Sequence, residues 1–265
     1  MKDAIKQAWE KRGRLWKDEK VAVLHKSLPL AVNNYIHRIH LDEIVPLLPR
    51  KKCRCLDVGC GYGRIAQEVV LYNSKAFVHG IDVAPTFVHL FNKKLGKRGK
   101  AIVADVRKLP FGDNYFDFVW MIATLMYLEK KSDQEQAIHE IFRVLKPGGT
   151  VIMIEDNSKG MAIVELWGLI SWLMKLMRRN KTDISTGGIS FSWNAIDVMV
   201  ANADGTIRRK RGYPFLTFFL TTLVLIGRIF PLFTHFFLDI IGRLDKKFHE
   251  AYVSYFVTYV AQKKL

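Results

Sequence analysis

The sequence predicts an α/β fold in which a doubly wound, mostly parallel seven-stranded sheet carries helices on both faces. Between residues 53 and 155, short apolar runs alternate with helical stretches, which is the pattern of parallel βαβ units. The first run ends in a glycine-rich turn, a feature typical of the ligand-binding edge of such sheets. The 265 residues, 49% of them hydrophobic, suffice for one such domain with insertions.

Two helical stretches are expected ahead of the sheet. The first lies within residues 1–30 and is basic, and the second covers residues 33–48 and ends at Pro49. We therefore expect residues 1–50 to form an N-terminal helical segment and residues 51–265 to form the main domain.

The first five strands and their helices follow from the same alternation. Strands are expected at residues 53–58, 76–82, 101–104, 116–122 and 150–155. Helices are expected at residues 64–71, 85–95 and 134–145. The last helix should stop at Pro147-Gly148-Gly149, because proline and glycine both disfavour a continuing helix, and this turn should lead into the fifth strand.

The remainder of the chain combines regular elements with two strongly apolar insertions. A helix is expected at residues 190–204 and a sixth strand at residues 206–212. Residues 252–261 are rich in β-branched and aromatic side chains, which favours a seventh strand. The insertions are residues 158–182 and 213–245, and we expect both to be helical.

The cysteines and the N-terminal residues indicate the cellular compartment of the protein. Cys53, Cys55 and Cys60 are odd in number and crowded at one strand, which argues against a disulfide framework. They also lack the fourth ligand and the spacing of a zinc site, so no metal is expected. Because the chain opens on charged residues without an apolar signal segment, we expect a cytoplasmic protein.

Three strand ends carry the residues of a candidate cofactor site. The segment Leu56-Asp57-Val58-Gly59-Cys60-Gly61-Tyr62-Gly63 places glycines where a backbone approaches a ligand closely. Asp82 ends the next strand, where a carboxylate accepts hydrogen bonds from ribose hydroxyls. Asp105 ends the third strand and is followed by Val106, which places this pair beside an adenine ring.

These motifs, followed by Arg143-Val144-Leu145-Lys146-Pro147-Gly148-Gly149, resemble the class I S-adenosylmethionine-dependent methyltransferases. The resemblance covers residues 52–156 and is strongest to the subgroup that includes the ubiquinone/menaquinone methyltransferases. A dinucleotide-binding domain is disfavoured, because the spacing is GxGxG rather than GxGxxG. The resemblance specifies the fold and the methyl donor, S-adenosylmethionine, and leaves the acceptor open.

The resemblance implies cofactor-binding roles for the loop after the first strand. Gly59, Gly61 and Gly63 would let the loop pass the methionine part of the cofactor. Asp57 would support this loop and the cofactor ammonium group.

It also implies roles at the ends of the next three strands. Asp82, followed by Val83, would hold the ribose. Asp105 and Val106 would frame the adenine. Ile122, at the end of the fourth strand, would carry backbone groups toward the methionine end.

No residue is assigned as the catalytic base. His37 and His40, in a helix that often covers the cofactor in this family, are candidates, as are Tyr127 and Asp156 near the ends of strands four and five. For each of them a structural or surface role is favoured over a catalytic one. The sequence Met121-Ile122-Ala123-Thr124 departs from the Asn/Asp-Pro-Pro-Tyr/Phe motif of enzymes that methylate base amino groups, and speaks against that reaction.

The acceptor is expected to be small and lipophilic, or presented by a membrane. An antiparallel seventh strand, as in this family, would bring both apolar insertions to the cofactor edge of the sheet. The net charge of +16 suits peripheral binding to an anionic membrane. Neither insertion has the 18–20 uncharged apolar residues of a clean transmembrane span.

Three alternatives stay open. The apolar insertions could form a lid of ordinary core helices, and the positive charge could serve only solubility. The charge alone also suits an RNA or protein methyltransferase, although a nucleic-acid partner is the less favoured reading. A third alternative is a non-catalytic, membrane-associated partner protein that binds the cofactor.

Overall fold

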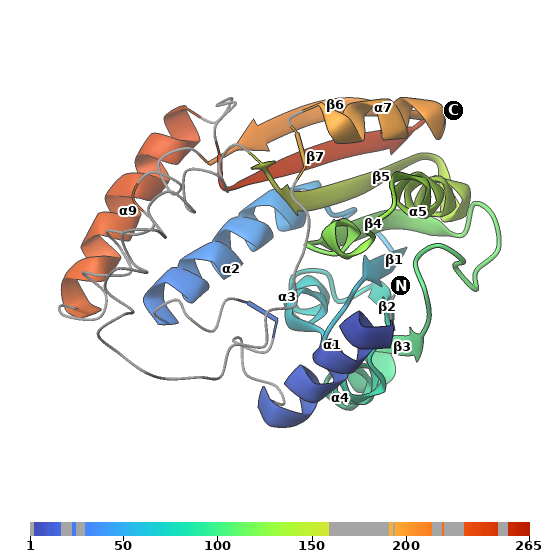
Figure 1. Ribbon diagram of the computed structural model, residues 1–265, viewed down its shortest axis with the longest axis horizontal. Helices are drawn as coiled ribbons and strands as arrows, with labels where there is room; N and C mark the ends of the chain where they lie inside the picture. The colour runs from blue at the N-terminus through green and yellow to red at the C-terminus, as the bar shows by residue number, and fades with distance from the viewer. Residues whose placement is uncertain are drawn as a thin grey trace.

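The computed structural model describes residues 3–16, 23–24, 30–158, 191–192, 194–213, 219, 231–248 and 254–265. Its centre is a seven-stranded sheet with the strand order β3-β2-β1-β4-β5-β7-β6 (Figure 1). Strand β7 runs antiparallel to both of its neighbours, and the other strands run parallel. This arrangement confirms the predicted fold class.

The strands are β1 (Cys53–Val58), β2 (Ala76–Asp82), β3 (Gly99–Val103), β4 (Phe116–Ile122), β5 (Leu145–Asp156), β6 (Gly205–Gly212) and β7 (Phe256–Lys263). Side chains of β4 alternate between two hydrophobic cores: Phe118 and Trp120 enter one core, while Val119 and Met121 enter the other. A strand that is buried on both faces needs an unbroken apolar run, which is why the sequence shows one here.

The helices are α1 (Asp3–Trp16), α2 (Leu30–Ile44), α3 (Arg64–Tyr72), α4 (Pro85–Leu95), α5 (Lys131–Val144), α7 (Ala195–Asn202) and α9 (Pro231–Lys247), with single 3₁₀ turns η2 (Val45–Leu47), η3 (Gly96–Arg98) and η4 (Leu125–Tyr127). Helices α2, α3 and α4 contribute to one core and α5 and α7 to the other, so both faces of the sheet are covered. No helix among the described residues is long and apolar enough to cross a membrane.

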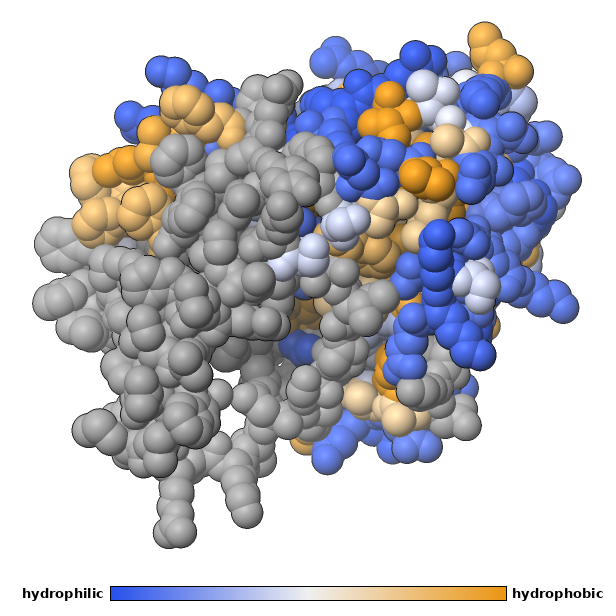
Figure 2. Space-filling model, turned by 45° about the horizontal axis from the view of Figure 1, so that its top comes forward, coloured by the Kyte–Doolittle hydropathy of each residue, from blue (hydrophilic) through white to orange (hydrophobic). Residues whose placement is uncertain are grey.

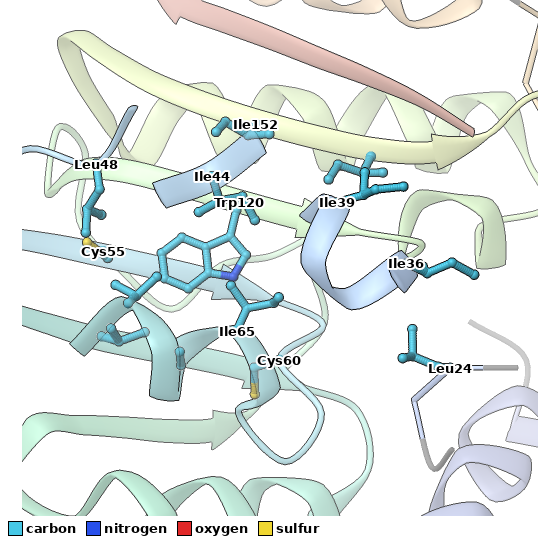
Figure 3. Packing of buried hydrophobic residues seen from close by; sticks show 14 of the residues in the cluster. Leu24, Ile36, Ile39, Ile44, Leu48, Cys55, Cys60, Ile65, Trp120 and Ile152 are labelled. Atoms are coloured by element: carbon cyan, nitrogen blue, oxygen red, sulfur yellow. The ribbon is translucent and has the colours of Figure 1, made fainter. Parts of the chain in front are cut away.

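The two ends of the molecule differ in surface character. The described surface is mostly hydrophilic, whereas apolar residues gather at the end that holds α9 (Figure 2). In the core under α2 and α3, Trp120 is fully buried, and Ile44, Ile65 and Ile152 lie around its indole (Figure 3). Trp120 of β4 therefore packs the sheet against α2 and α3.

The fifth strand differs from its prediction. Strand β5 begins at Leu145, without a separate turn at Pro147-Gly148-Gly149. Phe116 of β4 faces Leu145 while Phe118 faces Thr150, so the intervening residues bulge out of the ladder. Gly148 adopts a left-handed φ of 71°, which allows the chain to bulge and rejoin the sheet.

Other boundaries shift by a few residues. Helix α7 begins at Ala195, later than predicted, and β7 begins at Phe256. Of the two predicted apolar insertions, residues 159–182 lie outside the described residues, as do most residues between Tyr213 and α9. Helix α9 is the part of the second insertion that the structure describes.

Helix α1 docks on the N-terminus of α4. The Glu10 carboxylate accepts hydrogen bonds from the Thr86 backbone N–H at 3.0 Å and from the Thr86 hydroxyl at 2.6 Å. Helix α4 has no side-chain cap from its own N-cap residue, Ala84. Because the first N–H groups of a helix need external acceptors, Glu10 acts as a cap in trans and places α1 beside the carboxyl ends of the strands.

Candidate functional site

A pocket opens at the carboxyl ends of β1, β2, β3, β4 and β5, beneath α1 and α2. Seven of the nine predicted cofactor residues line it: Asp57, Gly59, Gly61, Asp82, Val83, Val106 and Ile122. Gly63 and Asp105 do not line it. The pocket therefore brings together residues from five strand ends that are distant in sequence.

The glycine loop after β1 is attached to the end of β2. The backbone N–H groups of Gly59 and Cys60 both donate to the carbonyl of Ile81 at 2.9 Å. Gly59 and Gly61 adopt left-handed φ values of 71° and 51°. A side chain at Gly59 would lie 2.2 Å from the Thr124 hydroxyl, so this turn requires glycine.

Gly63 has a different place from the other two glycines. It is the N-cap of α3, with a φ of 82°. A Cβ there would lie 2.9 Å from side-chain atoms of Phe91 and Leu95 in α4. Gly63 thus allows α3 and α4 to pack closely and does not face the pocket.

Asp82 is held ready for a ligand by the backbone around it. One carboxylate oxygen accepts from the Gly61 N–H and the other from the Ala84 N–H, both at 2.9 Å. Burial raises the pKa of Asp82 to about 6, against the lowering effect of these backbone donors. Each oxygen retains a lone pair for a ribose hydroxyl, so the loop and this carboxylate fit the nucleoside part of the cofactor.

Asp57 lies beneath the loop in a buried polar cluster. Burial raises its pKa to about 8, although the charge of Arg64 acts in the opposite direction. The Arg64 guanidinium donates to Nδ1 of His37 at 2.6 Å and to Nδ1 of His40 at 3.1 Å. Since arginine has no acceptor atom, both rings accept at Nδ1 and carry their proton on Nε2.

This cluster determines whether His37 or His40 can act as a general base. His40 lines the pocket, whereas His37 does not. With Nδ1 of each ring bound to Arg64 and the other ring nitrogen protonated, neither histidine presents a free basic nitrogen in this arrangement.

Asp105 forms an ion pair with Arg107 and does not line the pocket. The Arg107 guanidinium contacts Asp105 at 2.6 Å and Asp133 at 2.9 Å. Burial tends to raise the pKa of Asp105, but the hydrogen bonds and charge of Arg107 outweigh it and hold the pKa below its usual value. Val106 and Ala104 are the residues after β3 that line the pocket.

Glu155 organises the loop that follows β4, and the sequence analysis did not single it out. Its buried carboxylate accepts from the backbone N–H groups of Thr124, Leu125 and Met126 at 3.0, 2.9 and 3.2 Å. Burial raises its pKa to about 8, opposed by these donors. The available signal was an acidic residue within an otherwise apolar strand that is buried on both faces.

The N-terminal segment closes the pocket from above. Trp9 and Arg12 of α1 line it, as does Val23. The Trp9 ring meets Tyr127 edge-on at 5.4 Å, and the Arg12 guanidinium lies 5.1 Å from the Trp9 ring. Arg12 also donates to the carbonyl of Leu24. Neither Trp9 nor Arg12 was predicted as a site residue, because a tryptophan in a basic helix is the only signal in the sequence.

The far end of the pocket is aromatic and carries one acidic group. Asp156 is the last residue of β5 and pairs with Phe256, the first residue of β7, and the buried Tyr255 also lines this end. Burial raises the pKa of Asp156 to about 6. Among the described residues, no hydrogen bond or ion pair to its carboxylate is found.

The described part of the chain holds no group of three or more His, Cys, Asp or Glu side chains that could bind a metal ion. Cys53 and Cys55 lie 3.7 Å apart between their sulfur atoms, and all three cysteines are free.

Comparison with known proteins agrees with this geometry. Residues 56–153 match a family described as a methyltransferase domain. Residues 56–153 therefore form a methyltransferase domain that is similar to those of S-adenosylmethionine-dependent methyltransferases. The match confirms the predicted family and its cofactor, S-adenosylmethionine.

Three curated relatives show the range of this family. The sterol 4-C-methyltransferase of Caenorhabditis elegans is 34% identical over 121 residues, which is 44% of this chain and 34% of that protein. A ubiquinone/menaquinone biosynthesis C-methyltransferase of Geotalea daltonii is 33% identical over 111 residues, 40% of this chain and 46% of that protein. A tRNA (carboxymethyluridine(34)-5-O)-methyltransferase of Arabidopsis thaliana is 28% identical over 145 residues, 48% and 34% respectively. The chain thus spans less than half the length of these relatives.

The fold comparison extends over the whole chain. The crystal structure of magnesium protoporphyrin IX methyltransferase from Synechocystis PCC 6803, with bound SAH, has a TM-score of 0.60 at 12% identity. The alignment covers 99% of this chain and 97% of that one. The shared fold includes the elements outside the matched domain.

Proposed function

We propose that this methyltransferase domain transfers a methyl group to a small, lipophilic acceptor. The observation that supports this proposal best is that the two ends of the pocket differ. At one end, backbone N–H groups bind the Asp82 carboxylate, and at the other end Asp156 lies among aromatic side chains. The strand order β2-β1-β4-β5 separates these two carboxylates. A cofactor whose ribose lies at Asp82 leaves the Asp156 end for the acceptor.

Apart from one carboxylate that would accept a proton, the residues of the chain would orient the reactants without forming covalent bonds to them. When bound, S-adenosylmethionine supplies a methyl group on a sulfonium, from which it transfers by direct displacement. The glycine loop and the backbone after Ile122 would position the methionine end, and Tyr127 with Tyr255 would align the acceptor for in-line attack. Trp9 and Val23 would exclude water from above.

Asp156 is the group we propose to receive the acceptor proton. Its carboxylate would accept the proton that the acceptor loses as the bond to the methyl carbon forms and the carbon–sulfur bond breaks. Burial already raises its pKa to about 6, which makes it a better base near neutral pH than an ordinary aspartate. His37 and His40 are less suited, because Arg64 occupies a ring nitrogen of each.

The lipophilic character of the acceptor is supported by the lining of this end of the pocket. Ile36, Ile154, Met126 and Phe256 are among the residues there. The sterol and quinone methyltransferases among the relatives act on acceptors of this kind by name. Presentation of such an acceptor by a membrane, with the protein bound peripherally, is part of this proposal.

A transfer assay tests the proposal. The protein is incubated with S-adenosylmethionine labelled in the methyl group and with a lipid extract, and the label is followed into the organic phase. We expect a labelled lipophilic product whose mass identifies the acceptor, and no product with Asp82→Ala, which lacks the ribose-binding carboxylate.

The same assay separates the rival functions. The net charge of +16 and the tRNA-modifying relative favour a nucleic-acid acceptor as the second candidate. Label that enters an RNA or protein fraction instead of the organic phase would reject the lipophilic acceptor. Cofactor binding without transfer to any fraction would indicate a non-catalytic cofactor-binding protein.

A further inference from the structure

Helix α9 lies at the end of the molecule, with α2 between it and the sheet (Figure 1). Its inner face contributes Leu238 and Ile241 to the core, and at Gly242 a Cβ would lie 3.1 Å from the Tyr35 hydroxyl of α2. Ion pairs flank this contact, Arg38 with Asp239 at 3.3 Å and Lys246 with Asp42 at 3.9 Å. The inner face of α9 is therefore occupied by α2.

The outer face of α9 is apolar in its first half and basic in its second. Phe236, Ile240, Arg243 and Lys247 follow one another at spacings of four, three and four, so they form one exposed ridge. Phe236 is 63% exposed and Ile240 is 40% exposed. Apolar residues are visible at this end of the molecule (Figure 2).

We propose that this outer face of α9 binds the surface of an anionic lipid bilayer. Phe236 and Ile240 would enter the boundary between headgroups and acyl chains, and Arg243 and Lys247 would contact lipid phosphates. A helix that lies in the plane of a membrane uses this combination of aromatic, aliphatic and basic side chains.

Charge favours a bilayer over a second copy of the chain. In a symmetric dimer the same patch of each subunit would face its partner, which would place Arg243 and Lys247 of both copies within one interface. An anionic surface instead complements these cations and the net charge of +16. Asp239, the acidic residue on the exposed side, is already paired with Arg38.

Helix α2 links this surface to the candidate active site. Tyr35 of α2 contacts α9, and the next residue, Ile36, lines the acceptor end of the pocket, as does His40. A bilayer bound at α9 would therefore lie on the side of the molecule where α2 borders the pocket. In this respect the inference rests on the proposed function, and it names the surface through which the acceptor is presented.

Vesicle co-sedimentation of the full chain tests the inference. The probes are vesicles of phosphatidylcholine alone and of phosphatidylcholine with phosphatidylserine. We expect binding to the second kind only, weakened at least tenfold in Phe236→Ser/Ile240→Ser and in Arg243→Glu/Lys247→Glu. The matched control is Leu71→Ser/Val198→Ser, which removes exposed apolar side chains from other helices and should bind like the unaltered protein.

The outcomes distinguish this inference from the proposed function. All four substituted side chains of α9 are exposed, so unchanged cofactor affinity and melting temperature are expected to accompany the loss of vesicle binding. Failure of the unaltered protein to bind anionic vesicles overturns the inference, even if it methylates a detergent-solubilised lipid. Equal binding by the α9 variants, or a dimer that these variants dissociate, overturns it as well. Vesicle binding without methyl transfer to any fraction would instead overturn the proposed function alone.

Discussion

At the level of single side chains, the site depends on carboxylates that share a position at a strand end but differ in their surroundings. Asp82 accepts two backbone N–H groups at 2.9 Å and faces the pocket. Asp105 lies two residues beyond the end of β3, where it is bound by Arg107 and does not line the pocket. Position at a strand end is therefore not sufficient, because a neighbouring cation decides whether the carboxylate is available.

Cofactor affinity is expected to depend on the ionisation of Asp82. Ribose hydroxyls donate to the ionised carboxylate, whose pKa is about 6, so affinity should fall as the pH is lowered through 6. Asp82→Asn should weaken binding by roughly 10- to 100-fold, the loss of a charged acceptor, and should remove this pH dependence. Isothermal titration calorimetry with S-adenosylmethionine between pH 5 and pH 8 measures both effects. A variant that retains the pH dependence would show that another group causes it.

Asp156→Asn is expected to slow transfer without weakening cofactor binding. Loss of a general base typically costs about 10²- to 10⁴-fold in kcat, and the step in the rate profile near pH 6 should disappear. The matched control is Asp204→Asn, at an exposed left-handed position that asparagine tolerates well. Single-turnover rates with labelled cofactor measure the effect. An unchanged pH profile would contradict the assignment.

At the level of secondary-structure elements, a few acidic side chains connect segments that are far apart in the sequence. Glu10 joins α1 to α4, and Glu155 joins β5 to the loop after β4. Glu43 of α2 contacts Arg209 at 2.5 Å and Arg211 at 3.0 Å in β6. Each link fixes an element that borders the pocket or packs against one that does.

Glu10→Ala is expected to release α1 from α4. It removes the acceptor of the Thr86 N–H, and loss of a helix cap costs about 0.5–2 kcal/mol of unfolding free energy. Amide hydrogen exchange should rise in α1 and in the first turn of α4. Glu10→Gln retains a neutral acceptor, so its exchange rates should lie between those of the unaltered protein and those of Glu10→Ala. Unaltered exchange in α1 would mean that Trp9 and Arg12 hold this helix without Glu10.

Glu155→Ala is expected to disorganise the loop that carries Thr124. Three backbone N–H groups lose their acceptor, and each buried unpaired donor costs about 1–3 kcal/mol. The free energy of unfolding and the cofactor affinity should both fall, since Thr124 lies against Gly59. Urea unfolding measures the first quantity. Glu155→Gln keeps one oxygen acceptor, so its free energy of unfolding should fall less than that of Glu155→Ala. It therefore provides a folded variant for the measurement of cofactor affinity.

For the whole molecule, the sequence was sufficient for the sheet, the glycine loop after β1 and the methyltransferase domain, because apolar alternation and glycine spacing are local signals. It did not reveal the links made by Glu10, Glu43 and Glu155, because each depends on which distant backbone or arginine the fold brings near. The bulge at Gly148 was not predicted for the same reason. Pro147-Gly148-Gly149 has the local sequence of a turn, and only the pairing of Leu145 and Thr150 with β4 makes this segment part of a continuous strand. Arg209 and Arg211, for example, lie far from Glu43 in the sequence, and only the fold pairs them with this buried carboxylate.

The pH dependence of stability belongs to the whole molecule, because several buried carboxyls contribute to it. The pKa values of Asp57 and Glu155 are raised by burial to about 8, far above those of an unfolded chain. A carboxyl with a raised pKa stabilises the folded protein fully below its unfolded pKa of about 4, and this contribution is lost as the pH rises through the folded value. We therefore expect the unfolding free energy to fall by at least about 1.4 kcal/mol between pH 5 and pH 8, the effect of one such carboxyl over one pH unit. Urea unfolding at constant ionic strength measures this difference, and Asp57→Asn should reduce it. A free energy of unfolding that rises over this interval in the unaltered protein would contradict the expectation, and would mean that the charge of Arg64 keeps Asp57 ionised in the folded state.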